Sequence, residues 1–163
     1  MTYESNEPTC EHYCVFRVSD SWFGMLATSI REVIACPPLT DVPNASTILV
    51  GVCHFRNEFI PAIDVFESSD SDQRRQMMII STPTGTWGWL VDEVAGLSTL
   101  EMSICANANR ENSLTAAVMG HAAYGDKIVR VLDVNAVFRV VETQLKTHWE
   151  RVFSPEAASE VLV

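Results

Sequence analysis

Short stretches in which apolar and polar residues alternate follow one another along most of the chain, separated by turn residues. In the first stretch, Tyr13–Val18, the apolar residues Cys14, Phe16 and Val18 fall on one face, which is typical of a β-strand. Repeated short strands bounded by Gly, Pro, Asn and Asp favour an all-β domain. The same pattern predicts further strands over Trp22–Leu26, Val33–Cys36, Gly51–Phe55, Glu58–Ile63, Met77–Ser81, Thr86–Val91, Val94–Leu100, Val118–Tyr124 and Lys127–Leu132.

One predicted hairpin occurs twice. Gly51–Val65 matches Gly120–Val134 without a gap, after a shift of sixty-nine positions. Self-similarity of this kind indicates a repeated supersecondary unit. The identical pairs are Gly51/Gly120, Asp64/Asp133 and Val65/Val134, and the predicted turns lie at Arg56-Asn57 and Gly125-Asp126.

The strands of the first hairpin are apolar on both faces. Phe59 and Ile63 lie on one side, and Ile60 and Ala62 lie on the other. Both sides must therefore be covered, which favours two small barrels packed together over one open sheet. Pro61 cannot donate a hydrogen bond, so we expect it at a sheet edge or a bulge.

Helical structure is predicted in only a few places. A helical turn over Thr28–Val33 is predicted to be capped by Thr28 or Ser29, and Asp64-Val65-Phe66-Glu67 has the spacing of a capping box. A longer helix is predicted to begin after Asp133, which is expected to cap it, and to end at Ser154-Pro155. Its apolar face contains Val141, Leu145, Trp149 and Val152.

The domain organisation follows from these elements. We expect a flexible tail over 1–11, one folded domain over 12–153 and a second tail over 154–163. The acidic, serine-rich stretch ESSDSD places the boundary between the two barrel subdomains near 67–75.

Composition removes several classes of function. The net charge of −10 opposes binding to nucleic acid, whose phosphates would repel it. No apolar run reaches the roughly 20 residues of a membrane helix, so no direct membrane insertion is expected, and the acidic start is unlike a signal peptide. Five irregularly spaced cysteines fit buried thiols in a reducing cytoplasm.

No set of residues predicts catalysis, a metal site or a cofactor. Cys53 and His54 are neighbours on a strand, so they point to opposite faces and cannot act together. His12 and Cys14 share a face but lack the further ligands that a structural metal site needs. The four tryptophans are predicted to pack in the core, and an aromatic ligand pocket is the alternative: Trp22, Trp87, Trp89 and Trp149.

Two charged residues stand out from this background. Arg56 occupies the apex of the first hairpin, where the second hairpin has Gly125. Glu32 lies between apolar Ile30 and Val33, and a charge beside an apolar strip can give a protein-binding surface its specificity. Ordinary exposed charge explains both residues equally well from spacing alone.

These segments together resemble the CheW family of chemotaxis coupling proteins. The resemblance runs from about Tyr13 to Phe138. It rests on five segments in the family's order: WFGMLATSIREV within Val15–Val33, PPLTDVPN at Pro37–Asn44, GVCHFRNEFIPAIDV at Gly51–Val65, GWLVDEV at Gly88–Val94, and the closing hairpin Gly120–Asp133.

The resemblance implies a fold of two intertwined five-stranded SH3-like β-barrels with short connecting helices and a C-terminal helix. It also implies a cytoplasmic adaptor, recruited to membrane-associated receptor arrays, without enzymatic activity or a cofactor. Its partners would be the cytoplasmic hairpin tip of chemoreceptors and the regulatory domain of a CheA-type histidine kinase. By position, Ile30, Glu32, Val33 and Arg56 fall where the family meets the receptor; the kinase contacts are not assigned to residues.

The chain departs from the family beside this expected receptor contact. The family's N-L-R-G is His54-Phe55-Arg56-Asn57 here, so Asn57 must adopt the turn conformation usually given to glycine. These changes leave room for a receptor outside flagellar swimming, such as one controlling type IV pili or development. The rival hypothesis is a small-molecule sensor with Trp22, Trp87 and Trp89 lining a pocket between the barrels.

Overall fold

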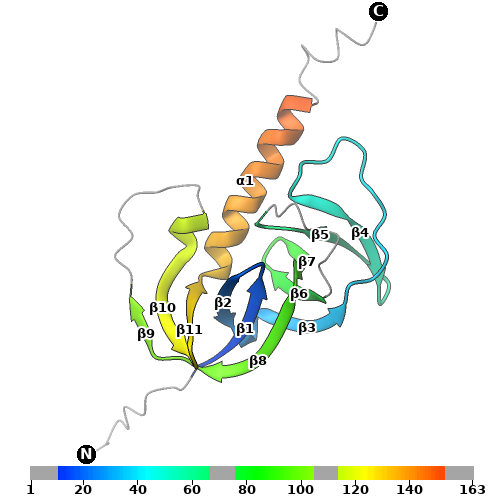
Figure 1. Ribbon diagram of the computed structural model, residues 1–163. Helices are drawn as coiled ribbons and strands as arrows, with labels where there is room; N and C mark the ends of the chain where they lie inside the picture. The colour runs from blue at the N-terminus through cyan, green and yellow to red at the C-terminus, as the bar shows by residue number, and fades with distance from the viewer. Residues whose placement is uncertain (1–10, 67–75, 105–113, 153–163) are drawn as a thin grey trace, which may run out of the picture.

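The computed structural model describes residues 11–66, 76–104 and 114–152, and it is built mainly from strands (Figure 1). Short 3-10 turns and one α-helix complete it. The elements are β1 (His12–Val18), β2 (Ser21–Leu26), η1 (Ala27–Ser29), β3 (Ile30–Ala35), β4 (Leu49–Phe55), β5 (Glu58–Ile63), β6 (Gln76–Thr82), β7 (Gly85–Val91), β8 (Glu93–Thr99), β9 (Met102–Ile104), η3 (Leu114–Ala117), β10 (Val118–Tyr124), β11 (Lys127–Leu132) and α1 (Val134–Val152).

The strands form two sheets, and each sheet takes strands from both sequence repeats. The order is β8-β1-β2-β11-β10-β9 in the six-stranded sheet and β3-β6-β7-β5-β4 in the five-stranded sheet. The third strand of each repeat pairs with the first strand of the other, as β3 with β6 and β8 with β1. The repeats are therefore intertwined, as expected. One sheet has a strand more than the predicted five, because the three-residue β9 extends its edge.

Three apolar clusters explain why the strands carry apolar residues on both faces. On β6, Met77 and Ile79 point into the interior of the five-stranded sheet, whereas Met78 and Ile80 point into the main core. The main core also contains residues of the six-stranded sheet and of α1. A third cluster fills the interior of the six-stranded sheet: Tyr13, Ala122 and Val131. Strand β6 thus separates two interiors, and burial of each large side chain contributes roughly 1.5–3 kcal/mol.

Two residues of the first hairpin differ from the prediction. Phe59 is not covered: it is 78% exposed on the outer face, where its ring lies 5.1 Å from that of His54. Pro61 is not on an edge strand, because β5 lies between β7 and β4. Pairing of β5 with β7 begins only at Ala62, so the missing N–H of Pro61 does not interrupt that ladder.

The helical turn predicted over Thr28–Val33 is also wrong. The 3-10 turn η1 is only three residues long and has no side-chain cap. Strand β3 begins at Ile30, which pairs with Ile80 of β6. Ladder hydrogen bonds to a distant strand therefore replaced the local helix that the capping residues favoured. The helix proposed after Asp64 is a turn at Val65 and Phe66, and its remainder lies outside the described residues.

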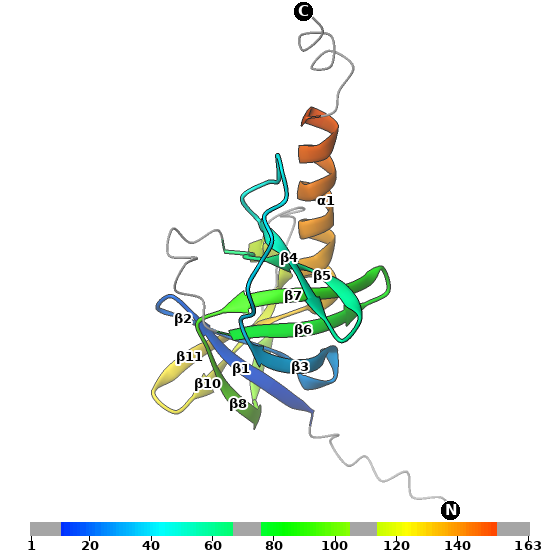
Figure 2. The same ribbon diagram turned by 90° about the vertical axis from the view of Figure 1, so that its right-hand side faces the viewer.

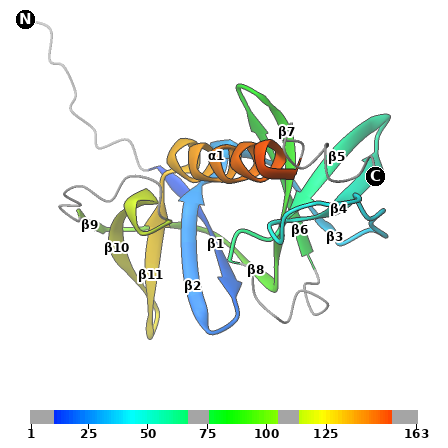
Figure 3. The same cartoon turned by 90° about the horizontal axis from the view of Figure 1, so that it is seen from above.

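Helix α1 closes the top of the molecule over the junction of the two sheets (Figure 3). The Asp133 Oδ1 atom accepts hydrogen bonds from the backbone N–H groups of Asn135 and Ala136, at 3.1 and 3.4 Å, which confirms the predicted cap. The Phe138 ring lies 5.7 Å from Trp87 and 6.3 Å from Trp89. These contacts hold the helix on its own domain.

Some predicted features lie outside the described residues. These are the tails, the subdomain boundary near 67–75 and the helix end at Ser154-Pro155. They stay predictions.

Candidate functional site

The turn of the first hairpin places Arg56 at the tip of the five-stranded sheet. Arg56 and Asn57 both have positive φ, +48° and +64°, as a tight two-residue hairpin requires. Asn57 thus adopts the predicted conformation. The equivalent Gly125 has φ +59° and adopts this conformation without steric cost, because it has no Cβ atom. Arg56 has a Cβ atom and adopts the same conformation at a cost of about 1–2 kcal/mol. Strain retained at one exposed residue favours a functional role for that side chain.

Glu32 forms an ion pair with Arg56, although β3 and the β4–β5 hairpin lie at opposite ends of the strand order of this sheet. β3 and β4 are the two end strands of the five-stranded sheet. The Arg56 Nη2 atom lies 3.0 Å from Glu32 Oε1, and Arg31 Nη1 lies 3.1 Å from Glu58 Oε2. A bulge in β3 between Ile30 and Glu32 makes Arg31 the extra residue. The two ion pairs thus join β3 to the hairpin tip, which lies beside it in Figure 2.

The four predicted receptor-contact residues have different environments. Arg56 is 63% exposed, and its guanidinium lies 5.0 Å from the ring centre of Phe55. Val33 is exposed, whereas Glu32 is half-buried. Ile30 is half-buried against the main core. We call Ile30, Glu32, Val33 and Arg56 the Glu32–Arg56 site, and its exposed chemistry comes from the ion pair and Val33.

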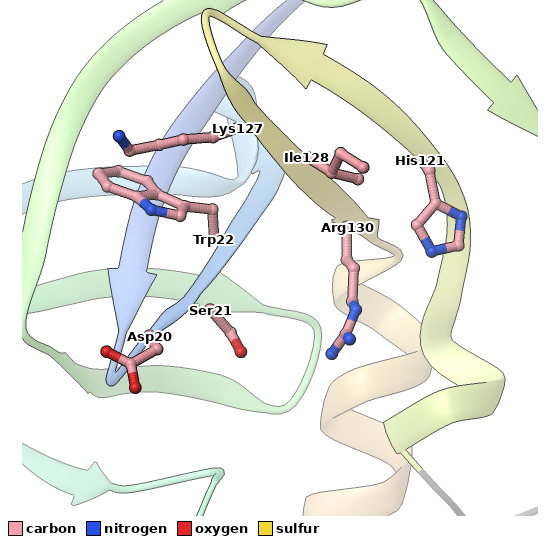
Figure 4. A pocket seen from close by; sticks show the side chains of 7 residues that line it. All are labelled: Asp20, Ser21, Trp22, His121, Lys127, Ile128 and Arg130. Atoms are coloured by element: carbon pink, nitrogen blue, oxygen red, sulfur yellow. The ribbon is translucent and has the colours of Figure 1, made fainter.

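A second concave feature was not foreseen from the sequence. A cavity of about 570 Å³ opens on the outer face of the six-stranded sheet (Figure 4). It lies where β2, β10 and β11 run side by side. We call it the Arg130 cavity, and its lining residues are Asp20, Ser21, Trp22, His121, Lys127, Ile128 and Arg130. The available signal was the pair Lys127 and Arg130 on one repeated hairpin of an otherwise acidic chain.

The tryptophans do not share one cavity. Trp22 lines the Arg130 cavity, whereas Trp89 is fully buried in the main core and Trp87 packs against the same core. Trp149 is half-buried there as well. The core packing predicted for Trp87, Trp89 and Trp149 is confirmed, and Trp22 is the exception because its side chain lies on the outer face of β2, whereas that of Phe23 is buried in the main core.

The cysteine and histidine candidates are also separated. Cys53 is buried and His54 is exposed, which confirms that they point to opposite faces. Burial raises the pKa of the Cys14 thiol to about 11, so it is a poor nucleophile near neutral pH. Within 11–66, 76–104 and 114–152, no group of three or more His, Cys, Asp or Glu is placed to hold a metal ion.

Comparison with known proteins identifies the family of this chain. The model of the CheW-like domain matches residues 12–142, which is most of the chain. The chain belongs to the CheW-like family. The match begins with β1 and ends inside α1, so it contains every described strand of both sheets and both sites.

Two curated CheW-like relatives are similar in sequence. The "Probable chemotaxis protein CheW" of Rhizobium etli is 22% identical over 139 residues, covering 79% of this chain and 88% of that protein. The "Chemotaxis protein CheW" of Rhizobium meliloti is 26% identical over 90 residues, covering 52% of this chain and 58% of that protein.

A solved structure has the same fold. The scaffolding protein TtCheW from Thermoanaerobacter tengcongensis matches with a TM-score of 0.67 and 20% identity, covering 85% of this chain and 94% of that chain. The two sheets are thus the two SH3-like barrels of the CheW fold. Among the described residues, no helix is long and apolar enough to cross a membrane.

Proposed function

We propose that this CheW-like chain is a non-catalytic adaptor that couples chemoreceptors to a CheA-type histidine kinase. It would work in the cytoplasm, at receptor arrays, and contact the receptor's cytoplasmic hairpin tip through the Glu32–Arg56 site. The kinase's regulatory domain would bind elsewhere on the chain. Holding both partners in one assembly would let a receptor's conformational bias change kinase activity.

The ion pair between Glu32 and Arg56 is the observation that supports this proposal. The pair lies at an exposed hairpin tip, and the Arg56 backbone keeps a costly conformation. An exposed ion pair contributes only about 0–1 kcal/mol to stability, so folding alone gives little reason for this arrangement. The pair instead offers a partner a specific pattern of one positive and one negative group.

The residues around Arg56 favour a receptor outside flagellar swimming. Phe59 is widely exposed on the adjoining strand, and His54 lies directly across from it. His54 and Asn57 replace the family's usual residues, so the surface around the retained arginine differs in size and polarity. We propose a pathway controlling type IV pili or development.

Binding of a receptor fragment tests the site. The fragment is the cytoplasmic hairpin of a receptor encoded beside this chain, and its affinity is measured by calorimetry. Arg56→Ala and Glu32→Ala should each weaken binding about ten-fold or more, because each leaves the partner's matching charge unpaired. The exchange of both charges, Arg56→Glu with Glu32→Arg, should keep the ion pair but still weaken binding.

The control removes an ion pair of the other sheet. Glu93→Ala deletes the contact between Glu93 Oε2 and Arg17 Nε at 3.3 Å, and it should leave receptor binding unchanged. Undiminished binding by both alanine variants would remove the site assignment. Binding restored by the charge exchange would instead assign the pair a purely structural role. Fragments of flagellar and pilus receptors, compared in parallel, test the pathway.

A further inference from the structure

The Arg130 cavity has a chemical character opposite to that of the chain. Its lining contains three side chains that can carry positive charge, from Lys127, Arg130 and His121, and one carboxylate, from Asp20. The whole chain has a net charge of −10. A concave basic patch concentrates anionic groups locally, whereas the net negative charge of the whole chain repels other copies of it. The cavity therefore selects for an acidic ligand.

Arg130 is the cation best placed to bind such a ligand. It lies on β11 directly across from His121 of β10, and its side chain is exposed. Among the residues that the structure describes, its side chain has no hydrogen-bond or ion-pair partner, although its backbone pairs with the neighbouring strands. Lys127 differs, because its ammonium lies 5.0 Å from the ring centre of Trp22 and 3.4 Å from Asp126. The guanidinium of Arg130 can therefore donate two parallel hydrogen bonds to a carboxylate without losing an existing side-chain partner.

The cavity also has an apolar part, which a small inorganic anion would leave uncovered. Ile128 is 72% exposed, and Figure 4 shows it beside Arg130 and His121, with Lys127 extended over Trp22. An exposed large apolar residue next to a free guanidinium and a half-buried tryptophan resembles the centre of a protein interface. Such a surface suits a segment that carries carboxylates and apolar side chains together.

We infer that the Arg130 cavity docks an acidic, partly apolar segment of a protein partner. A carboxylate of the segment pairs with Arg130, and an apolar side chain covers Ile128. The cavity lies on the six-stranded sheet, whereas the Glu32–Arg56 site lies on the five-stranded sheet. The inference therefore does not depend on the proposed receptor contact.

Nuclear magnetic resonance titration of the full chain tests this inference. The probe is a synthetic peptide, Gly-Ser-Glu-Leu-Glu-Glu-Leu-Glu-Gly-Ser, at low ionic strength, where charge attraction is least screened. The signals followed are the indole N–H of Trp22 and the methyl groups of Ile128. We expect saturable shifts of both signals that weaken as salt is added.

Three comparisons decide the outcome. Arg130→Gln should weaken binding about ten-fold or more, and Ile128→Ser should weaken it as well. Arg139→Gln, which removes an exposed guanidinium from α1, is the matched control and should have no effect. Because all three side chains are exposed, the variants should fold normally, which their amide spectra will show.

Several results would overturn the inference. One is the absence of saturable shifts with the acidic peptide, and another is equal binding of an analogue with Lys in place of Glu. Unchanged affinity in Arg130→Gln would do the same. Glutarate with the affinity of the peptide would indicate a site for small dicarboxylates and not for a protein segment.

Discussion

Gly51 is the residue whose replacement tests the packing of the repeated hairpin most directly. A Cβ atom on Gly51 would lie 2.8 Å from the Thr40 carbonyl oxygen and 3.0 Å from Leu39 Cβ. Thr40 and Val52 exchange two backbone hydrogen bonds, each 2.9 Å long, so the loop is held against the strand at this point. Gly51→Ala must therefore push the loop backbone away from β4.

The expected loss of stability follows from these contacts. Overpacking against a backbone atom costs roughly 1–3 kcal/mol. Weakening the two Thr40–Val52 bonds adds up to about 0.5–1.5 kcal/mol each. The alanine recovers about 0.4–1 kcal/mol by restricting the unfolded chain. We expect a net loss of about 2–4 kcal/mol, which corresponds to a fall in Tm of about 5–15 °C for a domain of this size.

Urea and thermal unfolding of wild-type protein and Gly51→Ala measure this loss. The matched control is Gly24→Ala, whose Cβ would lie 3.2 Å from Val129 Cγ1 and 3.3 Å from Leu100 Cδ1. Those contacts are longer and involve side-chain atoms and not backbone, so this variant should lose less stability than Gly51→Ala. Equal stability of Gly51→Ala and wild type would refute the reasoning, as would an equal loss in both variants.

Three further predictions concern the helix and the buried thiol. Asp133→Ala should lower stability by about 1 kcal/mol in urea unfolding, because it removes the α1 cap, and Asp133→Asn should restore most of it. Phe138→Ala should cost about 3–5 kcal/mol and, in near-ultraviolet circular dichroism, perturb the signal of Trp87 and Trp89; an unchanged spectrum would contradict the packing. The Cys14 pKa is raised to about 11 from 9.0 in the folded chain, so only the unfolded chain loses this proton between these pH values. Stability should therefore fall as pH rises from 9 to 11, by at most about 1.4 kcal/mol per pH unit from this group, and the slope should be smaller in Cys14→Ala.

Much of the local structure could be read from the sequence. The second hairpin has the predicted bounds, and the first was predicted within two residues, because alternation and turn residues act over short distances. The repeated Asp64 and Asp133 have equivalent backbone roles: their N–H groups donate to the carbonyl oxygens of Ile48 and Ala117, at 2.9 and 2.8 Å. Apolar residues on both strand faces also predicted two interiors, since such faces must both be buried.

The tertiary structure decided how these pieces combine. Each repeat offers the same strand edges, so alternation alone cannot say whether β3 pairs within its own repeat or with β6 of the other. It also cannot say which apolar face stays open, as Phe59 and Ile128 show. The Glu32–Arg56 pair joins residues 24 positions apart, and the Arg130 cavity combines β2 with the distant β10 and β11. Both sites exist because long-range strand pairing, which short-range sequence patterns do not encode, brings these edges together.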